Sequence, residues 1–503
     1  MKRCAKGTLV VLGILLSIAP FLLVSIPPMT DLCQHVLVSH ILNNYEEPQL
    51  NYKDYFDINY SPAPTSLAYL LLSYLQRIAG PFGGAKLFLI LFVVCLWMAQ
   101  FLYLKQLGIQ DPSLMATGSL PLTFSWFVYM GFLPFIMTFP LYLFLLCWWT
   151  GHSCSVSRSA GAAVLLLVTY GFHIVGGAVG AFSIFCLSLI SNWGTKRFWM
   201  NVIKDFLALV PIGVLTLVFL SRGEGPSVTI FYKGPVETLK AFVAYTFGSL
   251  AEPVIWIGVA GVAFLGAVIF HTILRRRCNT DILILVVGLC VLGLAMPHSL
   301  GALWPAGPRL LPYAIMAGFG LISIEKRGRL IFSVVVVIIL ISMCLLTVNK
   351  AFLIEKRYEK FLSGIPKVEY GKKLLPIIVD PGEGSKHIDP FWSIASAYTI
   401  IRGGSQPYIF AYPYVKTNAS PLKFKDYDAY GYAFLYKTSV EAKEYRGVSD
   451  SYDYVLTWGE EPEILSTISS EMSLVFENSR LRIYGRNAQH KQHEYIERDI
   501  LGQ

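Results

Sequence analysis

Charged residues are scarce in this chain of 503 residues, because only 15% are Asp, Glu, Lys or Arg while 54% are hydrophobic. Soluble domains carry about 25% charged residues, so the shortage excludes an ordinary soluble protein of this length. The mean hydropathy of +0.55 agrees with that exclusion. The composition therefore indicates a polytopic α-helical membrane protein with some soluble mass attached.

Cysteine pairs are also lacking. No two cysteines have CxxC spacing, and none of the nine lies after residue 344. The sequence therefore suggests neither a zinc site nor a disulfide framework. An A-x-A cleavage site is missing after the first apolar stretch, which has a basic flank and a length that spans a bilayer. We therefore interpret residues 8–28 as a retained helix rather than a removed signal peptide.

Acidic residues with the spacing of metal ligands are lacking as well. The acids of the first loop, Glu46, Glu47, Asp54 and Asp57, match no metal motif, and the short turns near 130 and 173 contain no acid. Hard divalent cations need several oxygen ligands, so the sequence does not support a metal site, and we expect no cofactor. The net charge of +9 is explained by basic cytoplasmic loops, so no nucleic-acid partner is expected.

Apolar segments of spanning length are abundant. We expect about eleven transmembrane helices, at 8–28, 84–104, 112–129, 132–149, 158–172, 175–193, 203–221, 251–271, 281–296, 309–323 and 330–349. A further apolar stretch, residues 64–80, is short, and we interpret it as a helix lying in the membrane interface with Tyr69 and Tyr74 near the headgroups. With that assignment the positive-inside rule is obeyed, because the basic loops all become cytoplasmic: 193–204, 271–281 and 324–329.

The same topology divides the chain into two parts. Residues 1–349 are expected to form a transmembrane domain whose first outside loop is 29–83, with the N-terminus in the cytoplasm of a cell inner (plasma) membrane. Residues 350–503 are expected to form an extracytoplasmic α/β domain of ordinary size. Its apolar periodicity predicts strands at 371–380 and 453–458, a helix at 461–472 and a hairpin around Asn478 and Ser479.

One carboxylate follows the first spanning helix directly. Thr30 is expected to cap a helix from Asp31 to about Asn43, which places Asp31 in the first turn, where the helix dipole favours an ionised carboxylate. His35 is four residues further on and shares a face with Asp31. A carboxylate held at the membrane surface suits a general base. A simple capping role also explains the spacing, because Asp is common in first turns.

Several basic residues are expected at the same outer rim. Lys86 opens the second spanning segment and Arg309 opens the tenth, with His298 near Arg309 in the sequence. Ammonium and guanidinium groups bind phosphate well, so with Asp31 they suggest a site for an anionic headgroup. Each of these basic residues, taken alone, also has a simpler explanation: its side chain extends from the helix end so that the charged group reaches water. Weaker candidates are His173, Arg222 and Lys233.

Several segments together form a recognisable pattern, which is spread over nearly the whole chain: "PMTDLCQH" (28–35), "YSPAPTSLAYLLLSYLQRIAGPFGGAKLFLIL" (60–91), "GFLPFIMTFPLYLFLL" (131–146), "GFHIVGGAVG" (171–180), "GPRLLPYAIMAG" (307–318), "IIRGGSQPYIF" (400–410) and "DYVLTWG" (453–459). With these segments the chain resembles the C-type glycosyltransferases. That family includes protein O-mannosyltransferases, lipid A aminoarabinose transferases and lipid A galacturonosyltransferases.

The resemblance implies a polyprenyl-phosphate monosaccharide as the sugar donor and an envelope glycan, lipid or protein as the acceptor. By the motif match, Asp31 takes the place of the catalytic aspartate, with His35 as possible support. Lys86 takes the place of a basic residue near the carrier phosphate. Arg309 takes the place of an arginine at an outside-facing helix start, and His298 is expected to help bind the same phosphate. Transfer would invert the anomeric centre. The chain departs from the metal-using members because its second outside loop lacks an acidic motif.

Two other classes of function fit the same composition. A transporter or flippase of a lipid-linked substrate would have many spans with scattered cations, but it would more often show inverted halves and paired broken helices near the midplane. A non-enzymatic envelope scaffold would use the extracytoplasmic domain at residues 350–503 to bind a partner. The enzyme hypothesis differs from both because it predicts Asp31, Lys86 and Arg309 around one cavity at the outer rim.

Overall fold

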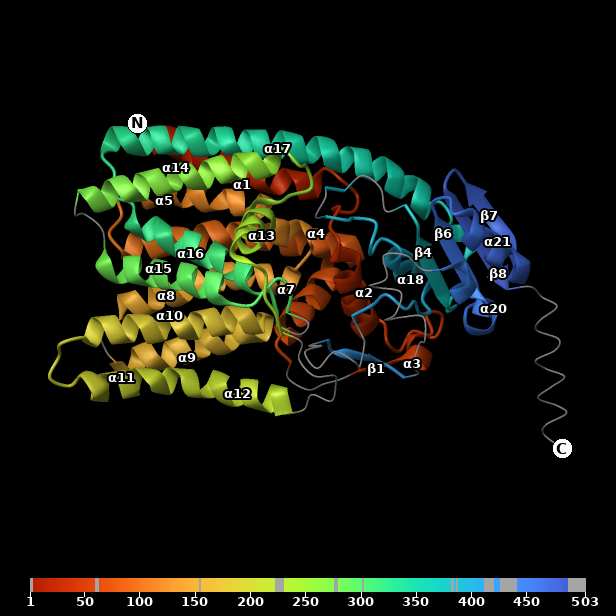
Figure 1. Cartoon of the computed structure of the whole chain (residues 1–503), viewed down its shortest axis with the longest axis horizontal. Helices are drawn as coiled ribbons and strands as arrows, with labels where there is room; N and C mark the ends of the chain where they lie inside the picture. The colour runs from red at the N-terminus through yellow and green to blue at the C-terminus, as the bar shows by residue number, and fades with distance from the viewer. Residues whose placement is uncertain are drawn as a thin grey trace.

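The computed structural model describes most of the chain, namely residues 3–58, 63–152, 155–221, 230–275, 279–300, 303–380, 384–385, 388–410, 420–425 and 441–486. Long helices run side by side through most of the molecule, and a small sheet lies at the opposite end from the N-terminus (Figure 1). The helical bundle thus forms one part of the fold, and the strands from the C-terminal third form the other.

The bundle is built from apolar helices with few charges. Its main members are α1 (Arg3–Leu22), α4 (Ser66–Gln106), α8 (Thr138–Gly151), α9 (Ser155–Phe172), α10 (Ile174–Asn192), α11 (Phe198–Phe206), α12 (Val210–Ser221), α14 (Val254–Leu274), α15 (Thr280–Ala295), α16 (Leu311–Gly318) and α17 (Lys326–Leu362). Short connecting helices complete it, namely α5 (Pro112–Met115), η1 (Ala116–Phe124), α6 (Trp126–Tyr129), α7 (Leu133–Ile136), η2 (Leu207–Leu209), α13 (Pro235–Phe247), η3 (Gly307–Leu310) and η4 (Phe319–Leu321).

Six helices of the described chain are long and apolar enough to cross a membrane, and three shorter apolar helices accompany them. These helices are those of a multi-pass membrane protein, although the expected count of about eleven is not reached by this criterion. Two expected spans, 112–129 and 309–323, are broken into short α and 3-10 pieces. Pro121 lies inside η1, where proline removes a backbone N–H and interrupts the helix, and Pro312 lies in the first turn of α16, where it is tolerated and marks the helix start.

Helix α4 has a sharp kink at the boundary expected between the stretch 64–80 and the span 84–104. Gly80 has φ 74° and ψ 176°, a conformation open essentially to glycine alone, and Pro81 follows it. The first part of α4 packs along α2 (Leu32–Asn43). Tyr74 is 62% exposed, but Tyr69 is only 4% exposed and faces the protein. The expectation that Tyr69 lies at the headgroups is therefore wrong, because it packs against α2 instead.

Ion pairs join segments at the bundle end that carries the N-terminus. Asp111 contacts both Lys6 of α1 and Arg329 of α17, the latter at 3.0 Å. At a neighbouring position Arg275 lies 3.2 Å from Glu325. The N-terminus and the loops near 111, 275 and 325 therefore share one end of the bundle, and the assignment of that end to the cytoplasm stays a prediction.

The opposite end joins the first loop to the C-terminal third. The loop contains α2, α3 (Tyr52–Tyr55) and β1 (Phe56–Ile58), and β1 pairs antiparallel with β5 (Leu422–Phe424). Tyr52 donates its hydroxyl to the carbonyl of Thr399 at 2.8 Å. A second two-stranded sheet pairs β2 (Ile230–Phe231) antiparallel with β3 (Ser299–Leu300).

The C-terminal sheet has four strands in the order β4-β6-β8-β7. β4 (Leu374–Ile378) is parallel to β6 (Tyr454–Trp458), and the hairpin of β7 (Met472–Asn478) and β8 (Leu481–Arg486) completes it. The strands and the helix α21 (Pro462–Glu471) lie where the sequence predicted them, with the hairpin turn one residue later, at Ser479 and Arg480. The remaining short helices are η5 (Ile365–Lys367), α18 (Ser396–Arg402), η6 (Ala442–Tyr445) and α20 (Val448–Ser451).

Candidate functional site

Asp31 is held by backbone contacts between the first loop and the turn after α6. Its N–H donates to the carbonyl of Met130 at 2.8 Å, and the N–H of Thr30 donates to Tyr129 at 3.0 Å. Gly131 makes this approach feasible, because its φ is 78° and a Cβ there would lie 2.7 Å from the nitrogen of Leu32. Two loops far apart in sequence therefore position the carboxylate together.

The capping expectation for this helix needs correction. α2 begins at Leu32, so Asp31 itself is the N-cap residue, and its side chain makes no capping hydrogen bond. Thr30 does not cap the helix either, because its Oγ1 accepts a hydrogen bond from the N–H of Asp389 at 3.1 Å. The carboxylate of Asp31 therefore does not cap the helix. The simpler interpretation of this residue, a capping role alone, required that it should.

The environment of Asp31 strongly shifts its acidity. The side chain is buried, and burial raises the pKa of Asp31 to about 7, while the positive charge of Arg309 lowers it in part. Burial disfavours the charged carboxylate, and a nearby cation favours it. A carboxyl group with a pKa near the working pH can accept and release a proton readily, which is what general base catalysis needs.

Arg309 is buried, with 5% of its surface exposed, and is held rigidly by its own turn. Its Nε donates to the carbonyl of Pro305 at 3.0 Å and its Nη2 to that of Trp304 at 2.9 Å. The guanidinium carbon lies 4.7 Å from the ring centre of Phe132 and 4.9 Å from that of Phe135. Cation–π contacts and carbonyls hold the group without neutralising its charge.

His173 contributes a second hydrogen-bond donor beside Arg309. It is the N-cap residue of α10, and its Nδ1 accepts the N–H of Val175 at 3.2 Å. Burial and the charge of Arg309 lower the pKa of His173, so the ring is neutral and its one proton is on Nε2. That Nε2 lies 3.4 Å from Nη1 of Arg309. Two groups that both carry hydrogen therefore face one place, where an anionic oxygen would satisfy both.

A neutral His298 lies next to this region through an aromatic contact, with Lys233 close to its ring. The indole Nε1 of Trp304 donates to Nε2 of His298 at 3.0 Å, so His298 is joined to the turn that holds Arg309. Burial and the charge of Lys233 lower the pKa of His298, which places Lys233 near that ring. The remaining weaker candidate, Arg222, lies outside the described residues.

His35 points toward Tyr69 rather than forming a described bond with the Asp31 carboxylate. Its Nδ1 lies 3.0 Å from the hydroxyl of Tyr69, and its ring lies 4.9 Å from that of Phe410. Burial lowers the pKa of His35 to about 3, so the ring is neutral. The charge of Asp31 acts on Tyr69, so these two residues are close as well. The structure therefore links His35 to the site through Tyr69.

Lys86 lies in the part of α4 that follows the kink, and it is half-buried. No hydrogen bond or ion pair of its ammonium group is recorded within the described chain. Its charge is not among the causes that shift the pKa of Asp31, whereas that of Arg309 is. Of the cations expected around Asp31, Arg309 is therefore the one whose electrostatic contact is described.

Sequence reasoning missed three residues of this region, namely Tyr69, Trp304 and Asp389. Tyr69 could have been found from its place on the same helix face as Gln76, which also packs on α2. Asp389 comes from the C-terminal third, its N–H bonds Thr30, and burial raises its pKa to about 6. No local pattern in the sequence points to Asp389 or to Trp304.

The described residues contain no group of three or more His, Cys, Asp or Glu side chains that could hold a metal ion. The chemistry available to the described side chains is that of one buried carboxyl group in electrostatic contact with a buried guanidinium, and of a neutral imidazole N–H beside that guanidinium. Such a set can take a proton from a hydroxyl group and stabilise a departing anion.

Comparison with known proteins identifies the fold. No family model matches the chain, and no curated protein matches it in sequence. Among solved structures, the crystal structure of ArnT from Cupriavidus metallidurans in the apo state is similar over 97% of this chain and 99% of that chain, with a TM-score of 0.53 and 11% sequence identity. The chain therefore has an ArnT-like fold, and the expected resemblance to the C-type glycosyltransferases is confirmed at the level of the fold.

Proposed function

We propose that this chain is an inverting glycosyltransferase that moves a monosaccharide from a polyprenyl-phosphate donor to an envelope acceptor on the outer face of the membrane. The observation that carries the proposal is the buried pairing of Asp31 with Arg309 at one end of an ArnT-like bundle. A buried carboxyl group beside a buried cation suits a reaction that consumes a proton-bearing nucleophile and releases an anion.

In the proposed reaction the ionised Asp31 accepts the proton of an acceptor hydroxyl group. The acceptor oxygen attacks the anomeric carbon as the bond from that carbon to the phosphate oxygen breaks, and the electron pair leaves with the lipid phosphate. One displacement inverts the anomeric centre. General base action of this kind contributes roughly 10²–10⁴-fold to the rate.

The leaving phosphate is proposed to bind at Arg309 and His173. The guanidinium Nη1 and the imidazole Nε2–H lie 3.4 Å apart and both have hydrogen to donate. Lys86 would extend the positive region around the carrier phosphate, and the neutral His298 would contribute a hydrogen-bond donor. Donors placed in advance where charge develops are worth about 2.7–4 kcal/mol each in acyl-transfer enzymes, because a buried site does not have to reorganise.

Asp31→Asn is the direct test of the proposal. The amide cannot act as a base, so transfer should fall by about 10²-fold or more, while the fold is retained because the backbone bonds of Asp31 do not depend on its carboxylate. Envelope glycolipids and glycoproteins are compared by mass spectrometry between cells that lack the gene and cells that carry each variant.

Asp57→Asn provides the matched control, because this exposed carboxylate of the same outer loop lies on the small strand β1. It should transfer as the unchanged protein does. Size-exclusion profile and melting temperature in detergent establish that both variants fold. Full transfer by a folded Asp31→Asn variant would remove Asp31 from the reaction.

A further inference from the structure

Residues Thr30 and Asp31 lie between two other parts of the chain. On the bundle side, their N–H groups donate to the carbonyls of Tyr129 and Met130, at 3.0 and 2.8 Å respectively. From the C-terminal third, the N–H of Asp389 donates to Oγ1 of Thr30 at 3.1 Å. The backbone that carries the candidate base is therefore held both by the turn after α6 and by the C-terminal third.

The side chain of Asp389 fixes the turn to which its own N–H belongs. Its Oδ1 accepts the N–H of Phe391 at 3.1 Å, an arrangement in which an aspartate closes a turn on its own backbone two residues later. The carbonyl of Pro390, inside this turn, accepts the hydroxyl of Tyr358 of α17 at 2.7 Å. Because both bonds restrict the backbone at Asp389, they also restrict the direction of the N–H that reaches Thr30.

Aromatic packing joins the same turn to the C-terminal sheet. The buried ring of Phe391 stacks on that of Trp458 of β6, with ring centres 5.4 Å apart and ring planes inclined by 16°. It also contacts the rings of Tyr358 and Phe361 of α17, at 5.2 and 5.9 Å and closer to edge-on. Buried aromatic pairs of this kind add to the packing energy, so the turn is a firm part of the C-terminal third.

The carboxylate of Asp31 needs this support from its backbone. The side chain makes no capping hydrogen bond, and a general base must keep its oxygens available for the proton of the acceptor hydroxyl group. Its position is therefore set through the backbone on either side of it. That position matters for the rate, because a misplacement of about 1 Å can cost roughly 10²-fold.

We propose that Thr30 and Asp389 are positioning residues for Asp31, and this inference rests on the function proposed above. The turn at Asp389 holds the hydroxyl of Thr30, and Thr30 in turn holds the backbone from which the carboxylate of Asp31 extends. Neither residue touches the reacting atoms. Loss of the contact leaves the base present but poorly placed, so transfer falls while the protein stays folded.

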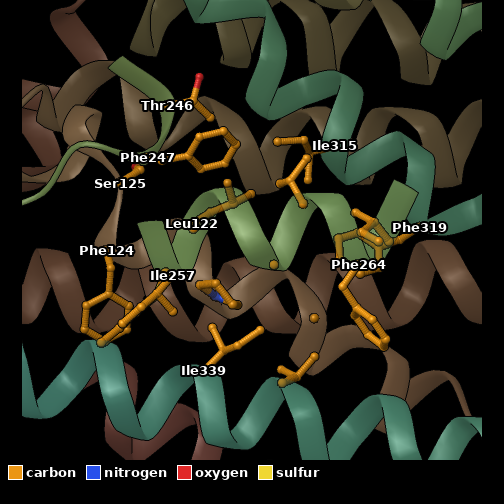
Figure 2. Close-up of a pocket in the computed structure, with 18 of the residues that line it drawn as sticks. Leu122, Phe124, Ser125, Thr246, Phe247, Ile257, Phe264, Ile315, Phe319 and Ile339 are labelled. Carbon is orange, nitrogen blue, oxygen red and sulfur yellow. The ribbon is translucent and has the colours of Figure 1, made fainter. Parts of the chain in front are cut away.

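Variants of Thr30 test the contact from the side of the first loop. Thr30→Val removes the acceptor oxygen and keeps the shape of the side chain, whereas Thr30→Ser keeps the oxygen. Thr246→Val is the matched control, because Thr246 is also buried but its hydroxyl oxygen has no hydrogen-bond partner among the described residues. Figure 2 shows Thr246 beside Phe247 at the wall of a cavity of about 60 Å³ in the bundle. The control therefore makes the same chemical change without the loss of a described bond.

Variants of Asp389 test the contact from the side of the C-terminal third. Asp389→Ala removes the oxygen that closes the turn, whereas the amide oxygen in Asp389→Asn can still accept the N–H of Phe391. Glu471→Ala is the matched control. One carboxylate oxygen of Glu471 accepts the N–H of Gly447 at 2.8 Å, a bond of the same kind between two residues of the C-terminal third. This control therefore reports any general effect of losing such a carboxylate.

Hydrogen exchange of the full chain in detergent measures the hold on the loop directly. The N–H groups of Thr30 and Asp31 are both bonded, so they should exchange slowly in the unchanged protein. The peptide that contains them should exchange several-fold faster in Thr30→Val and Asp389→Ala. It should exchange at the unchanged rate in Thr30→Ser, in Asp389→Asn and in the two controls. Unchanged exchange in both Thr30→Val and Asp389→Ala would overturn the inference.

Transfer is the second readout, measured as modified envelope products per folded protein in cells that carry each variant. Thr30→Val and Asp389→Ala should lower transfer by about 10- to 10²-fold, and Thr30→Ser and Asp389→Asn should restore most of it. Faster exchange together with full transfer would mean that the contact merely stabilises the loop, which would also overturn the inference. The proposed function is judged separately by Asp31→Asn, and the exchange measurement needs no transfer, so the two failures are distinguishable.

Discussion

At the scale of single residues, the decisive feature is a carboxyl group buried beside a guanidinium group to which no carboxylate of the described residues is bound. Asp31 and Arg309 act on each other electrostatically, but no hydrogen bond between them is recorded in the described chain. Arg309 instead donates to the carbonyls of Trp304 and Pro305. The positive charge is therefore still available for an anionic ligand, while Asp31 remains ionisable near neutral pH.

The pH dependence of transfer follows from this arrangement. A general base works only when ionised, so the rate should rise with pH and reach half of its maximum at about pH 7, the pKa to which burial raises Asp31. Arg309→Gln removes the cation that lowers this pKa, so the midpoint should move to higher pH. The measurement is the initial rate of transfer by purified protein between pH 5 and 9.

Arg309→Lys is the control for this shift. The ammonium group keeps the positive charge but loses the fork of hydrogen bonds to two carbonyls. The rate should fall, while the midpoint stays closer to pH 7 than in Arg309→Gln. An unchanged midpoint in Arg309→Gln would contradict the electrostatic coupling of the two residues.

At the scale of elements, the kink in α4 matters most for the site. Before the kink, the helix is fastened to α2, because Gln76 donates to the carbonyl of Val36 at 3.0 Å and Asn43 donates to that of Ser73 at 2.9 Å. This fastening brings Tyr69 to His35. After the kink, the helix enters the bundle and carries Lys86. One backbone bend at Gly80 therefore sets the positions of both groups.

Gly80→Ala should destabilise the protein through the backbone alone. A Cβ at this position would meet nothing within 4 Å, but the φ of 74° and ψ of 176° are open essentially to glycine, which costs other residues about 1–3 kcal/mol. The melting temperature in detergent should fall, and transfer should fall with it because Tyr69 and Lys86 shift.

Gly213→Ala is the matched control for that variant. It also adds a Cβ that meets nothing within 4 Å, but it lies within the helix α12. Alanine is favoured over glycine there by about 1 kcal/mol, so this variant should melt at the same temperature or higher. If both variants melted alike, the strain assigned to Gly80 would be absent.

At the scale of the whole molecule, the loop between α1 and α4 makes several contacts with the C-terminal third. β1 and β5 pair, Tyr55 donates to the carbonyl of Gly371 at 3.0 Å, and the N–H of Gly404 donates to that of Leu50 at 2.7 Å. The loop that carries Asp31 is thus fastened both to the bundle and to the C-terminal third. We expect the C-terminal third to help hold the site, beyond any role in acceptor binding.

Gly403→Ala tests this fastening. Its φ is 72° and a Cβ would lie 2.4 Å from the backbone of Leu50, so the loop and the C-terminal third must move apart. Hydrogen exchange should become faster in β1 and in α18, with the bundle unaffected.

Gly447→Ala separates the contact from simple backbone strain. Its φ is 74°, but a Cβ there would meet only a carboxylate oxygen of Asp450 at 3.6 Å. It should lower stability by about 1–2 kcal/mol through its left-handed conformation without faster exchange in β1. Equal effects of the two variants on β1 would show that the contact with Leu50 is unimportant.

Much of the architecture was predictable from local sequence, because hydrophobicity and periodicity are local properties. The long apolar runs indicated the helices of the bundle, and alternation and turn residues indicated β6, α21 and the β7–β8 hairpin. The separate character of the stretch 64–80 was also predicted, because the stretch is short for a span and its assignment to the interface leaves the basic loops on one side. The spans at 112–129 and 309–323 were overestimated, because hydropathy does not reveal where prolines shorten a helix.

The sequence by itself thus determined a membrane bundle with an α/β C-terminal third and singled out Asp31 and Arg309 as residues of interest. Only the tertiary structure decided that these two are close, that His173 has its ring proton beside Arg309, and that Tyr69 faces His35. The physical reason is that each of these contacts joins segments far apart in the chain. Packing of the whole bundle selects such neighbours, and no local pattern of residues encodes them.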